Sequence, residues 1–474
     1  MLVYNNCAFD ARVLKEAETL TSAGHDVRVV AVLDRTTKPV EDRDGVGILR
    51  IDRDPLHYRV LRAGRRLRRW ARLSRSRTRR RLLVMRKRAA RRSRLLRWVA
   101  PPAAPPRGAA TPYASTPQAR AGGRLKVVTG LPKRTLMLFH KPLLYWDWYR
   151  RAYADGRSSP ADVYHAHDLN TLPVAAALAR RTGAKLVFDA HELYPELSTL
   201  SRRERFVWRV AERRLVRRAD QVVTVCQSIA EEIAQRSRVP RPLVVHNCPK
   251  LGVNDTDGEP SLERKLGRAG DAAIVLYQGG FAPNRGLAEL VAASTWFDDA
   301  VLVLMGWGRL EPELRRQVAA EGLGERVIFT TPVPQAELLD HTRGADIGVI
   351  PYLPVGLNNR YSAPNKLFEY MAAGIPIVAS RLPELTRFVD GLRIGRTVEP
   401  GDPRALAAAV NGLLGDAEAR ARIAERAREA SLEYCWQTQA QTLLDVYGAF
   451  AEPAGRLDSV AGLVELTRPH DDAL

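Results

Sequence analysis

The sequence lacks the patterns that mark secreted, zinc-bound and membrane-spanning chains. Its four cysteines (Cys7, Cys226, Cys248 and Cys435) are scattered and form no CxxC pair, which argues against a disulfide framework or a zinc site and favours a reducing compartment. No run approaches the roughly 18 apolar residues that a membrane span needs, and the start, MLVYNNCAFD, has no basic segment followed by an apolar one. We therefore expect a cytoplasmic protein whose contact with any membrane is peripheral.

Acidic residues are missing from one long segment. Residues 59–98 contain 18 arginines and one lysine but no aspartate or glutamate. The rest of the chain has 55 basic and 53 acidic residues, so nearly all of the net charge of +21 comes from this segment. Val60, Leu67 and Trp70 lie at helical spacing in this segment, which is typical of a basic amphipathic helix on an anionic membrane surface. A solvated, partly unfolded insertion is the main alternative. Nucleic acid is the least favoured partner, because only Trp70 and Trp98 interleave the cations.

Strand and helix patterns alternate in two series, which a polar stretch at 249–271 separates. Two βαβ series predict an α/β chain with two Rossmann-like, doubly wound parallel sheets that face a cleft. In such sheets, ligands bind beyond the carboxyl ends of the strands. The expected parts are an N-terminal domain, a basic and Pro-rich insertion within it, a C-terminal domain, a helix that returns to the first domain, and a tail, at residues 1–250, about 57–125, 270–430, 431–452 and 453–474.

A lysine and a glutamate three residues apart open a helix in YSAPNKLFEYMAAGIPIVAS (361–380). Asn365 and Lys366 fall in its first turn, where free backbone N–H groups and the helix dipole attract anions. Lys366 adds a positive charge for a phosphate, and Glu369 can accept hydrogen bonds from paired hydroxyls such as those of a ribose. These residues indicate a nucleotide diphosphate, and a solvated lysine beside a capping glutamate is the alternative.

Two glycine-rich loops follow strands in the same series. In YQGGFAPNRG, Gly279 and Gly280 let a ligand approach the backbone, and Arg285 can reach back as a cation. In MGWGR, Gly306 and Gly308 allow the same close approach. Each loop alone is a weak signal, but both lie at the strand ends where a nucleotide should bind.

With these motifs, the second series resembles glycosyltransferase family 4 (glycosyl transferases group 1), which has the GT-B fold. LFEYMAAGIPIVAS is similar to the family signature E-A-M-A-x-G-x-P-V-V-A-S, and the segments NRG, ADIGVIPY and GRTVEPGDPRALAAAV also match its pattern. The resemblance implies a retaining transfer of a sugar from a nucleotide diphosphate sugar, with no cofactor and no metal. Arg285 and Lys366 would neutralise the diphosphate. The donor-binding residues would be Gly279, Gly280, Gly306, Gly308, Asn365, Leu367 and Glu369.

Two positions depart from the family pattern. Tyr361 stands where the family usually has a further glutamate that contacts the transferred sugar, and Gly280 stands where it usually has an arginine. The donor sugar is therefore left open. A degenerate, non-catalytic scaffold that binds sugar or nucleotide, or a GT-B epimerase that needs no acceptor, remains an alternative.

The first series is expected to bind the acceptor, a lipid-linked or cell-surface glycan at the inner face of the cell membrane. CAFDARVLKEAETLTSAGHDVRVV looks like the family's first loop and helix. His191, in FDAHELYPE, corresponds to a family histidine near the reacting sugar, and a neutral imidazole there could take or hold a proton. The acceptor-side residues would be Asn6, Asp10, Arg12, His167 and Asp168.

A metal cluster is a competing interpretation of the first series. The candidate ligands would be His165, His167, Asp168, His191 and Glu192. We favour His165 as a hydrogen-bonded core residue and expect no metal. The Asp-x-Asp patterns at 52–54 and 255–257 are discounted, because three-residue patterns arise often by chance.

Overall fold

The computed structural model describes residues 1–55, 58, 140–252, 262 and 272–451. By its contacts, the chain divides into two units, one of Met1–Arg50 with Gly156–Leu474 and the other of Ile51–Asp155. The basic segment, most of the Pro-rich insertion and of the linker, the second Asp-x-Asp pattern and the tail lie outside the described residues. The domain boundaries expected from the sequence stay a prediction.

The second unit contributes most of one described helix, α4 (His140–Ser158). Within it, the Asp147 carboxylate accepts a hydrogen bond from the Asp54 backbone N–H at 2.9 Å and pairs with Arg151 at 3.2 Å. Trp146 is exposed. No helix among the described residues is both long and apolar enough to cross a membrane.

The first unit contains two groups of paired strands with their helices, which we call the N-lobe and the C-lobe. In the N-lobe (residues 1–50, 156–248 and α17), four strands pair in parallel in the order β4-β5-β6-β7, and three more follow the order β1-β3-β2. Leu2 forms parallel bridges to Val30 and to Ala166 and so joins the two sets. The strands are β1 (Arg28–Val32), β2 (Val40–Arg43), β3 (Val46–Ile51), β4 (Val163–His167), β5 (Lys185–Ala190), β6 (Gln221–Thr224) and β7 (Leu243–Val244).

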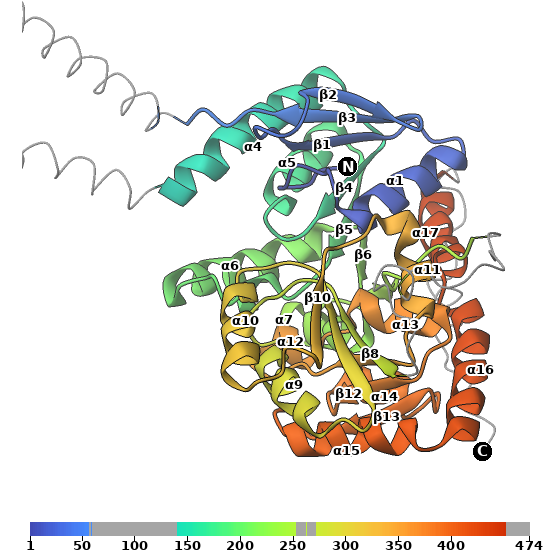
Figure 1. Ribbon diagram of the computed structural model, residues 1–474. Helices are drawn as coiled ribbons and strands as arrows, with labels where there is room; N and C mark the ends of the chain where they lie inside the picture. Colours follow the sequence, from blue (N-terminus) through green and yellow to red (C-terminus); the bar gives the residue numbers. More distant parts are fainter. Residues whose placement is uncertain (56–57, 59–139, 253–261, 263–271, 452–474) are drawn as a thin grey trace, which may run out of the picture. The chain divides into compact units, whose positions relative to one another are not determined.

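The C-lobe (residues 272–433) has six strands, all parallel, in the order β10-β9-β8-β11-β12-β13 (Figure 1). These strands are nearly all apolar, as expected for a parallel sheet that is buried on both faces. They are β8 (Ala273–Gln278), β9 (Ala300–Met305), β10 (Val327–Thr330), β11 (Ile347–Ile350), β12 (Ile377–Ser380) and β13 (Gly395–Val398).

Helices join the strands and pack over both sheets. In the N-lobe they are α1 (Ala11–Ser22), α5 (Leu172–Thr182), α6 (Arg202–Leu215) and α7 (Gln227–Ser237). In the C-lobe they are α9 (Leu287–Ala293), α10 (Glu311–Ala320), α11 (Leu338–Arg343), α12 (Leu357–Arg360), α13 (Asn365–Ala373), α14 (Pro383–Val389), α15 (Pro403–Leu414) and α16 (Ala417–Glu433). The expectation of two α/β domains built on parallel sheets is confirmed, and the N-lobe adds an antiparallel pair, β2 with β3.

Local signals explain where several helices begin and end. Asp10 caps α1 by accepting from the Val13 N–H, and Asp402 caps α15 with Pro403 at its first position. Gly374 ends α13 in the left-handed conformation. The pattern of Ser228 and Glu231 also predicts a capping box for α7, and this is wrong. Ser228 lies inside the helix and donates instead to the C-lobe carboxylate Glu384.

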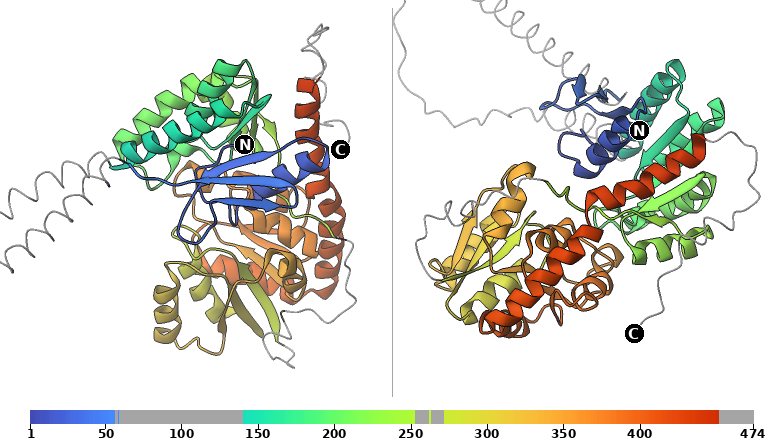
Figure 2. Two further views of the ribbon diagram at one scale, coloured as in Figure 1. Left: turned by 90° about the horizontal axis from the view of Figure 1, so that it is seen from above. Right: turned by 90° about the vertical axis from the view of Figure 1, so that its right-hand side faces the viewer.

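The last helix, α17 (Trp436–Ala451), packs against α1 of the N-lobe. The Trp436 indole N–H donates to the Thr19 hydroxyl at 2.9 Å, and Leu443 is buried in the N-lobe core. Because α16 packs on the C-lobe helix α13, the chain returns from the C-lobe to the N-lobe between α16 and α17, as the red ribbon in the right-hand view of Figure 2 shows.

Candidate functional site

A cavity of about 880 Å³ lies between the two lobes, within the size range of small-molecule sites. On the N-lobe side, its wall includes the segment after β5, with His191 and Glu192. On the C-lobe side, it includes the loops after β8 and β9 and the first turn of α13. The cavity therefore lies at the carboxyl ends of parallel strands, as predicted.

Hydrogen bonds join the lobes at the edges of this cavity. The Asn358 amide accepts from the Leu193 N–H at 2.8 Å and donates to the Leu193 carbonyl at 3.1 Å. Glu384, fully buried, accepts from the Ser228 N–H at 2.7 Å and from the Ser228 hydroxyl at 2.5 Å. Most of these contacts involve loops and helix ends, which are the elements that move when two lobes open or close.

Two cations of the C-lobe converge on aromatic rings in the cavity wall. The Lys366 ammonium lies 3.5 Å from the centroid of the Tyr277 ring and 5.3 Å from that of Tyr352, and the Arg285 guanidinium lies 4.1 Å from the same Tyr352 ring. Neither cation has an ion pair within 4 Å among the described residues. Ring faces favour a cation without neutralising it, so no carboxylate among the described residues competes with an anionic ligand for this pair.

Lys366 is only 6% exposed, and its Nζ has no hydrogen-bond partner among the described residues. Burial lowers the pKa of Lys366 well below its ordinary value, and repulsion from Arg285 lowers it further. A buried, unpartnered amine aimed at a cavity is costly unless an acceptor completes its hydrogen bonds. The geometry therefore fits an anionic ligand that contacts Lys366 directly.

Glu369 is held by a short chain of side-chain hydrogen bonds. The Thr342 hydroxyl donates to the Gln278 carbonyl oxygen at 2.9 Å, and the Gln278 amide donates to Glu369 Oε2 at 2.5 Å. All three side chains are buried, and Gln278 and Glu369 line the cavity. Burial raises the pKa of Glu369. One carboxylate oxygen is thus fixed by Gln278, and the carboxylate is oriented for a ligand.

The glycine loops serve two different purposes. Gly279, Gly280 and Gly306 line the cavity. A Cβ on Gly306 would lie 2.0 Å from the Gly279 carbonyl oxygen, and one on Gly308 would lie 2.3 Å from that of Phe281. These two glycines therefore let the loops after β8 and β9 pack on one another. Gly308 does not line the cavity, so its expected contact with a ligand has no support in the geometry.

The remaining donor-side candidates lie at the start of α13. Asn365 lines the cavity, and its amide oxygen accepts from Asn247 of the N-lobe at 3.0 Å. Leu367 is fully buried in the C-lobe core, and its N–H already donates to the Pro364 carbonyl at 2.9 Å. Leu367 therefore supports the helix from within and does not face the cavity.

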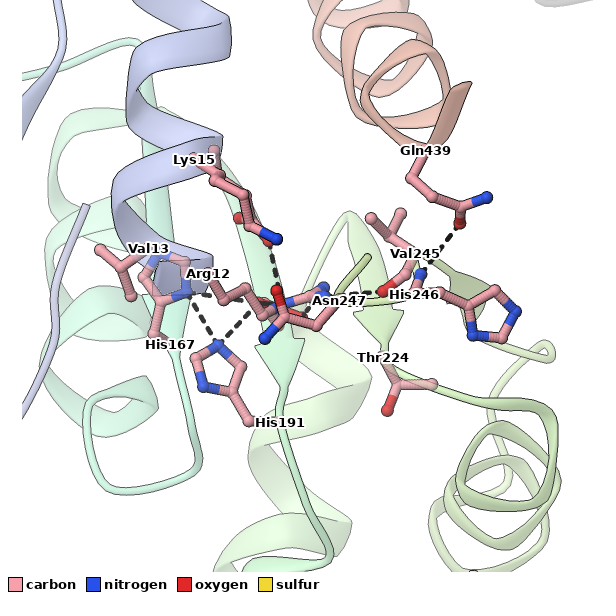
Figure 3. A network of polar contacts seen from close by, with 12 residues as sticks. Arg12, Val13, Lys15, His167, His191, Thr224, Val245, His246, Asn247 and Gln439 are labelled. Atoms are coloured by element: carbon pink, nitrogen blue, oxygen red, sulfur yellow. Dashed lines mark hydrogen bonds and ion pairs between the residues drawn. The ribbon is translucent and has the colours of Figure 1, made fainter. Parts of the chain in front are cut away.

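The N-lobe wall rests on a buried ion pair. Asp189, at the end of β5, accepts two hydrogen bonds from the Arg12 guanidinium, at 2.7 and 2.8 Å. Arg12 also donates to the Val245 carbonyl at 2.6 Å (Figure 3) and lies 3.0 Å from Glu16. Arg12 reaches the cavity wall, but it is almost fully buried and neutralised from within the N-lobe.

His191 points back at this pair. Its Nε2 lies 2.8 Å from Asp189 Oδ2 and 3.2 Å from His167 Nδ1 (Figure 3). Burial alone would lower the pKa of His191, but the Asp168 and Asp189 carboxylates outweigh it and raise the pKa to about 10. A pKa raised this far favours the imidazolium over the neutral imidazole near pH 7, and the proton-carrying role that the sequence suggests for His191 stays a prediction.

The other acceptor-side candidates divide between the wall and its support. Asn6 and Asp10 line the cavity, whereas His167 and Asp168 do not. Burial chiefly lowers the pKa of His167, to about 4. The carboxylate of Asp168 accepts a hydrogen bond from the backbone N–H of His191 at 3.2 Å. These two residues therefore position His191 and do not meet a ligand.

The five candidate metal ligands do not form one cluster. His165 and His167 instead meet Glu16 and Asp189 in a fully buried group whose ligand atoms lie within 4.8 Å of one another. Arg12 already lies 3.0 and 2.7 Å from these two carboxylates, so a divalent cation would face a neighbouring guanidinium. His165 is a core residue bonded to the Tyr447 hydroxyl at 2.9 Å, as predicted. The expectation of no metal stays a prediction.

Several residues of the site were not singled out from the sequence. Asp189 is a carboxylate inside the apolar strand pattern AKLVFDAH. A buried carboxylate of that kind is strongly destabilising unless a cation pairs with it. Exposed aromatic side chains also line the cavity, with Phe9 on the N-lobe and Trp307 on the C-lobe. Trp307 lies in the MGWGR loop, where an aromatic residue between two glycines is a usable signal for stacking on a ligand.

Comparisons with known proteins agree with this architecture. Residues 272–416 match the family model described as "Glycosyl transferases group 1", and residues 78–248 match "Glycosyl transferase 4-like domain". A D-inositol 3-phosphate glycosyltransferase of Nocardioides sp. is 29% identical over 314 residues, which cover 60% of this chain and 67% of that one. The phosphatidyl-myo-inositol mannosyltransferase of Mycobacterium leprae is 29% identical over 329 residues, covering 65% and 78% of the two chains.

Solved structures give the same fold at low identity. Sucrose-phosphate synthase from Thermosynechococcus elongatus has a TM-score of 0.65 at 18% identity, and 92% of each chain is covered. Anabaena HepE in complex with UDP-glucose has a TM-score of 0.63 at 15% identity, covering 94% of this chain and 98% of that one. These likenesses show the GT-B fold. With two consecutive family models on its two lobes and curated relatives of the same class, the chain belongs to the group 1 glycosyltransferases.

Proposed function

We propose that the chain transfers a hexose from a nucleotide diphosphate sugar to a hydroxyl of a lipid-linked acceptor, with retention of configuration. One observation carries the proposal: Lys366 and Arg285 face a cavity between the lobes without an acidic partner among the described residues. Two unneutralised cations and the first turn of α13 form a site for a diphosphate.

In this proposal, the C-lobe stabilises the leaving group. The bond between the anomeric carbon and the diphosphate oxygen breaks, the acceptor oxygen bonds to that carbon, and the acceptor proton goes to the departing diphosphate. Negative charge builds on the diphosphate as the bond breaks, and fixed cations in a partly dehydrated site stabilise it. Lys366 and Arg285 supply that charge, and Glu369 accepts hydrogen bonds from the ribose.

The N-lobe would hold the sugar and the acceptor. His191 lines the cavity and would contact hydroxyl groups of the sugar or of the acceptor. The printed names of two relatives involve inositol phosphate and phosphatidylinositol. The second name supports the choice of a lipid-linked acceptor.

The proposal is tested by ligand-induced stabilisation followed by turnover. UDP-glucose, GDP-mannose and related donors are screened for a rise in the melting temperature, since a ligand that binds the folded state stabilises it. The donor that stabilises most is then incubated with the chain and lipid extracts, and the release of nucleoside diphosphate is measured. Binding without any turnover would instead support a non-catalytic scaffold, and conversion of the donor with no acceptor would support an epimerase.

A further inference from the structure

Helix α6 carries a surface that the cavity does not use. Its sequence is RRERFVWRVAERRL, and Phe206 and Val207 on it are 69% and 62% exposed. Arg202, Arg203 and Arg214 are exposed beside them and make no ion pair within 4 Å among the described residues. Aromatic and aliphatic side chains exposed among arginines mark a face that none of the described residues covers.

The arginines and the apolar pair share one side of α6. At 100° per residue, positions 202, 203, 206, 207, 213 and 214 fall within less than half of the helix circumference. Both acidic residues of the helix point elsewhere. Glu204 closes a capping box with Ser201, and Glu212 is buried, which raises its pKa to about 7. The exposed side of the helix is therefore basic and apolar, with no carboxylate.

The opposite side of α6 fixes it beside the cavity wall. Trp208 on this side packs edge-on against Tyr194, with ring centroids 5.0 Å apart, and Arg209, at the edge of the exposed face, pairs with Glu196 at 2.8 Å. Tyr194 and Glu196 belong to the short turn that follows His191 and Glu192 in the chain. A molecule bound to the outer side of α6 would therefore sit close to the N-lobe side of the site.

We propose that the outer side of α6 docks on an anionic lipid bilayer, with Phe206 and Val207 entering the interface and the arginines binding lipid phosphates. This rests on the proposed function, because it would bring the cavity to a lipid-linked acceptor. Nucleic acid would also attract the arginines, but apolar side chains that point outward at the centre of the basic face gain free energy in a bilayer. The docking surface is distinct from residues 59–98.

A fluorescent label at position 206 tests the insertion directly. All four native cysteines are buried, so a dye that reports polarity attaches selectively to Phe206→Cys in the full chain. With vesicles of phosphatidylcholine containing about 30% phosphatidylserine, we expect its emission to shift to the blue, and to stay unchanged with phosphatidylcholine alone. The matched control is Leu432→Cys on α16, a C-lobe position that is 68% exposed. Its emission should not shift.

Charge reversal tests the arginines. The double variant Arg203→Glu with Arg214→Glu should weaken vesicle binding more than 20-fold, since each cation near the membrane surface raises the binding affinity about fivefold. The control pair, Arg422→Glu with Arg426→Glu on α16, should change it less than twofold. Unchanged emission at position 206 with bound vesicles would overturn the proposal, as would a blue shift on RNA but not on lipid.

The same variants separate this inference from the proposed function. Donor binding without vesicles depends on Lys366 and Arg285, so the α6 charge variants should keep the donor-induced rise in melting temperature. A chain that docks through α6 but binds no nucleotide sugar would contradict the proposed function while leaving the surface intact. A chain that binds donor normally and whose α6 label stays in water would contradict only the surface.

Discussion

The two walls of the cavity treat positive charge in opposite ways. On the C-lobe, Lys366 and Arg285 rest against tyrosine rings and have no carboxylate within ion-pair distance among the described residues. On the N-lobe, Arg12 and His191 share the carboxylate of Asp189, and Asp168 lies 3.7 Å from the other nitrogen of His191. One wall keeps its charge unneutralised, and the other neutralises it within the protein.

This difference in charge neutralisation predicts different functions for the two walls. A cation that is already paired with a carboxylate gains little electrostatic free energy from a further anion, whereas an unpaired cation in a poorly hydrated site gains much. The C-lobe is therefore the wall that can bind and stabilise a diphosphate. The N-lobe cluster keeps one imidazolium in a fixed orientation, and its stability depends on charges that no ligand needs to touch. The predictions below test this division.

The largest effect is expected from breaking the N-lobe ion pair. Removing one partner of a buried pair destabilises a protein by about 3–5 kcal/mol, and we expect Asp189→Asn to lower the free energy of unfolding by about 3 kcal/mol. The lower end applies because Glu16, whose pKa is raised by burial and by Asp189 to about 8, can ionise beside Arg12 once Asp189 is neutral. Urea denaturation at pH 7 measures the loss.

A double-mutant cycle sharpens this prediction. Glu16→Gln alone should cost little at pH 7, since Glu16 is then mostly protonated, but together with Asp189→Asn it should cost more than the two single losses combined. Glu418→Gln, which removes an exposed carboxylate on α16, is the matched control. Simple additivity would show that Glu16 does not take over the pairing with Arg12 when Asp189 is neutral.

The next effect concerns the C-lobe charge and should appear in activity rather than stability. Lys366→Ala should lower kcat/KM by about 10²-fold or more, the range typical for removing one group that stabilises developing negative charge. Its melting temperature should not fall, since the lost amine has no hydrogen-bond partner to leave behind among the described residues. Lys38→Ala, at an exposed lysine, is the control. Activity equal to that of the parent chain would refute the role of Lys366.

The sequence predicted the C-lobe wall better than the N-lobe wall, for a physical reason. Lys366 and Glu369 lie on one helix whose start and end have local signals, and Arg285 follows a buried strand, so periodicity alone brings all three to one end of a parallel sheet. The two sheets and their cleft followed from the same alternation of strand and helix.

The N-lobe cluster depends on contacts between distant parts of the chain. Arg12 and Asp189 are 177 residues apart, and the carboxylate that holds Ser228 comes from 156 residues further on. No local pattern records such pairs, so Arg12 was expected to face a ligand and Ser228 to cap its own helix. The pKa of His191 depends on two carboxylates, Asp168 and Asp189, whose positions only the fold determines, so the sequence alone could not predict its direction.

A smaller effect is expected from the hydrogen bonds that orient Glu369. Thr342→Val removes the donor to Gln278 and frees the amide to turn away from Glu369, and one such bond is worth about 1 kcal/mol. We expect KM for the donor to rise about fivefold while kcat changes less than twofold, because Thr342 acts on ribose binding and not on the breaking bond. Thr438→Val, at an exposed threonine, is the control. An equal fall in kcat would place Thr342 in the chemical step.

The smallest expected effect is the uptake of a fraction of a proton by the protein when the donor binds. Because burial and Arg285 lower the pKa of Lys366 in the empty site, a bound diphosphate that pairs with the ammonium must raise that pKa again. At any pH between the two values, donor binding takes up a proton, and affinity falls as the pH rises through this window. Titration calorimetry with a nucleotide sugar, in buffers of different ionisation enthalpy and at several pH values below the ordinary pKa of lysine, measures the uptake. Lys366→Arg, which stays charged at every pH, should lose this uptake and retain only the part from Glu192, a cavity carboxyl whose pKa burial and Asp168 raise to about 7. If Lys366→Arg and the parent chain took up the same amount, the Lys366 amine would already be protonated in the empty site, and its pKa would not be lowered there by burial and Arg285.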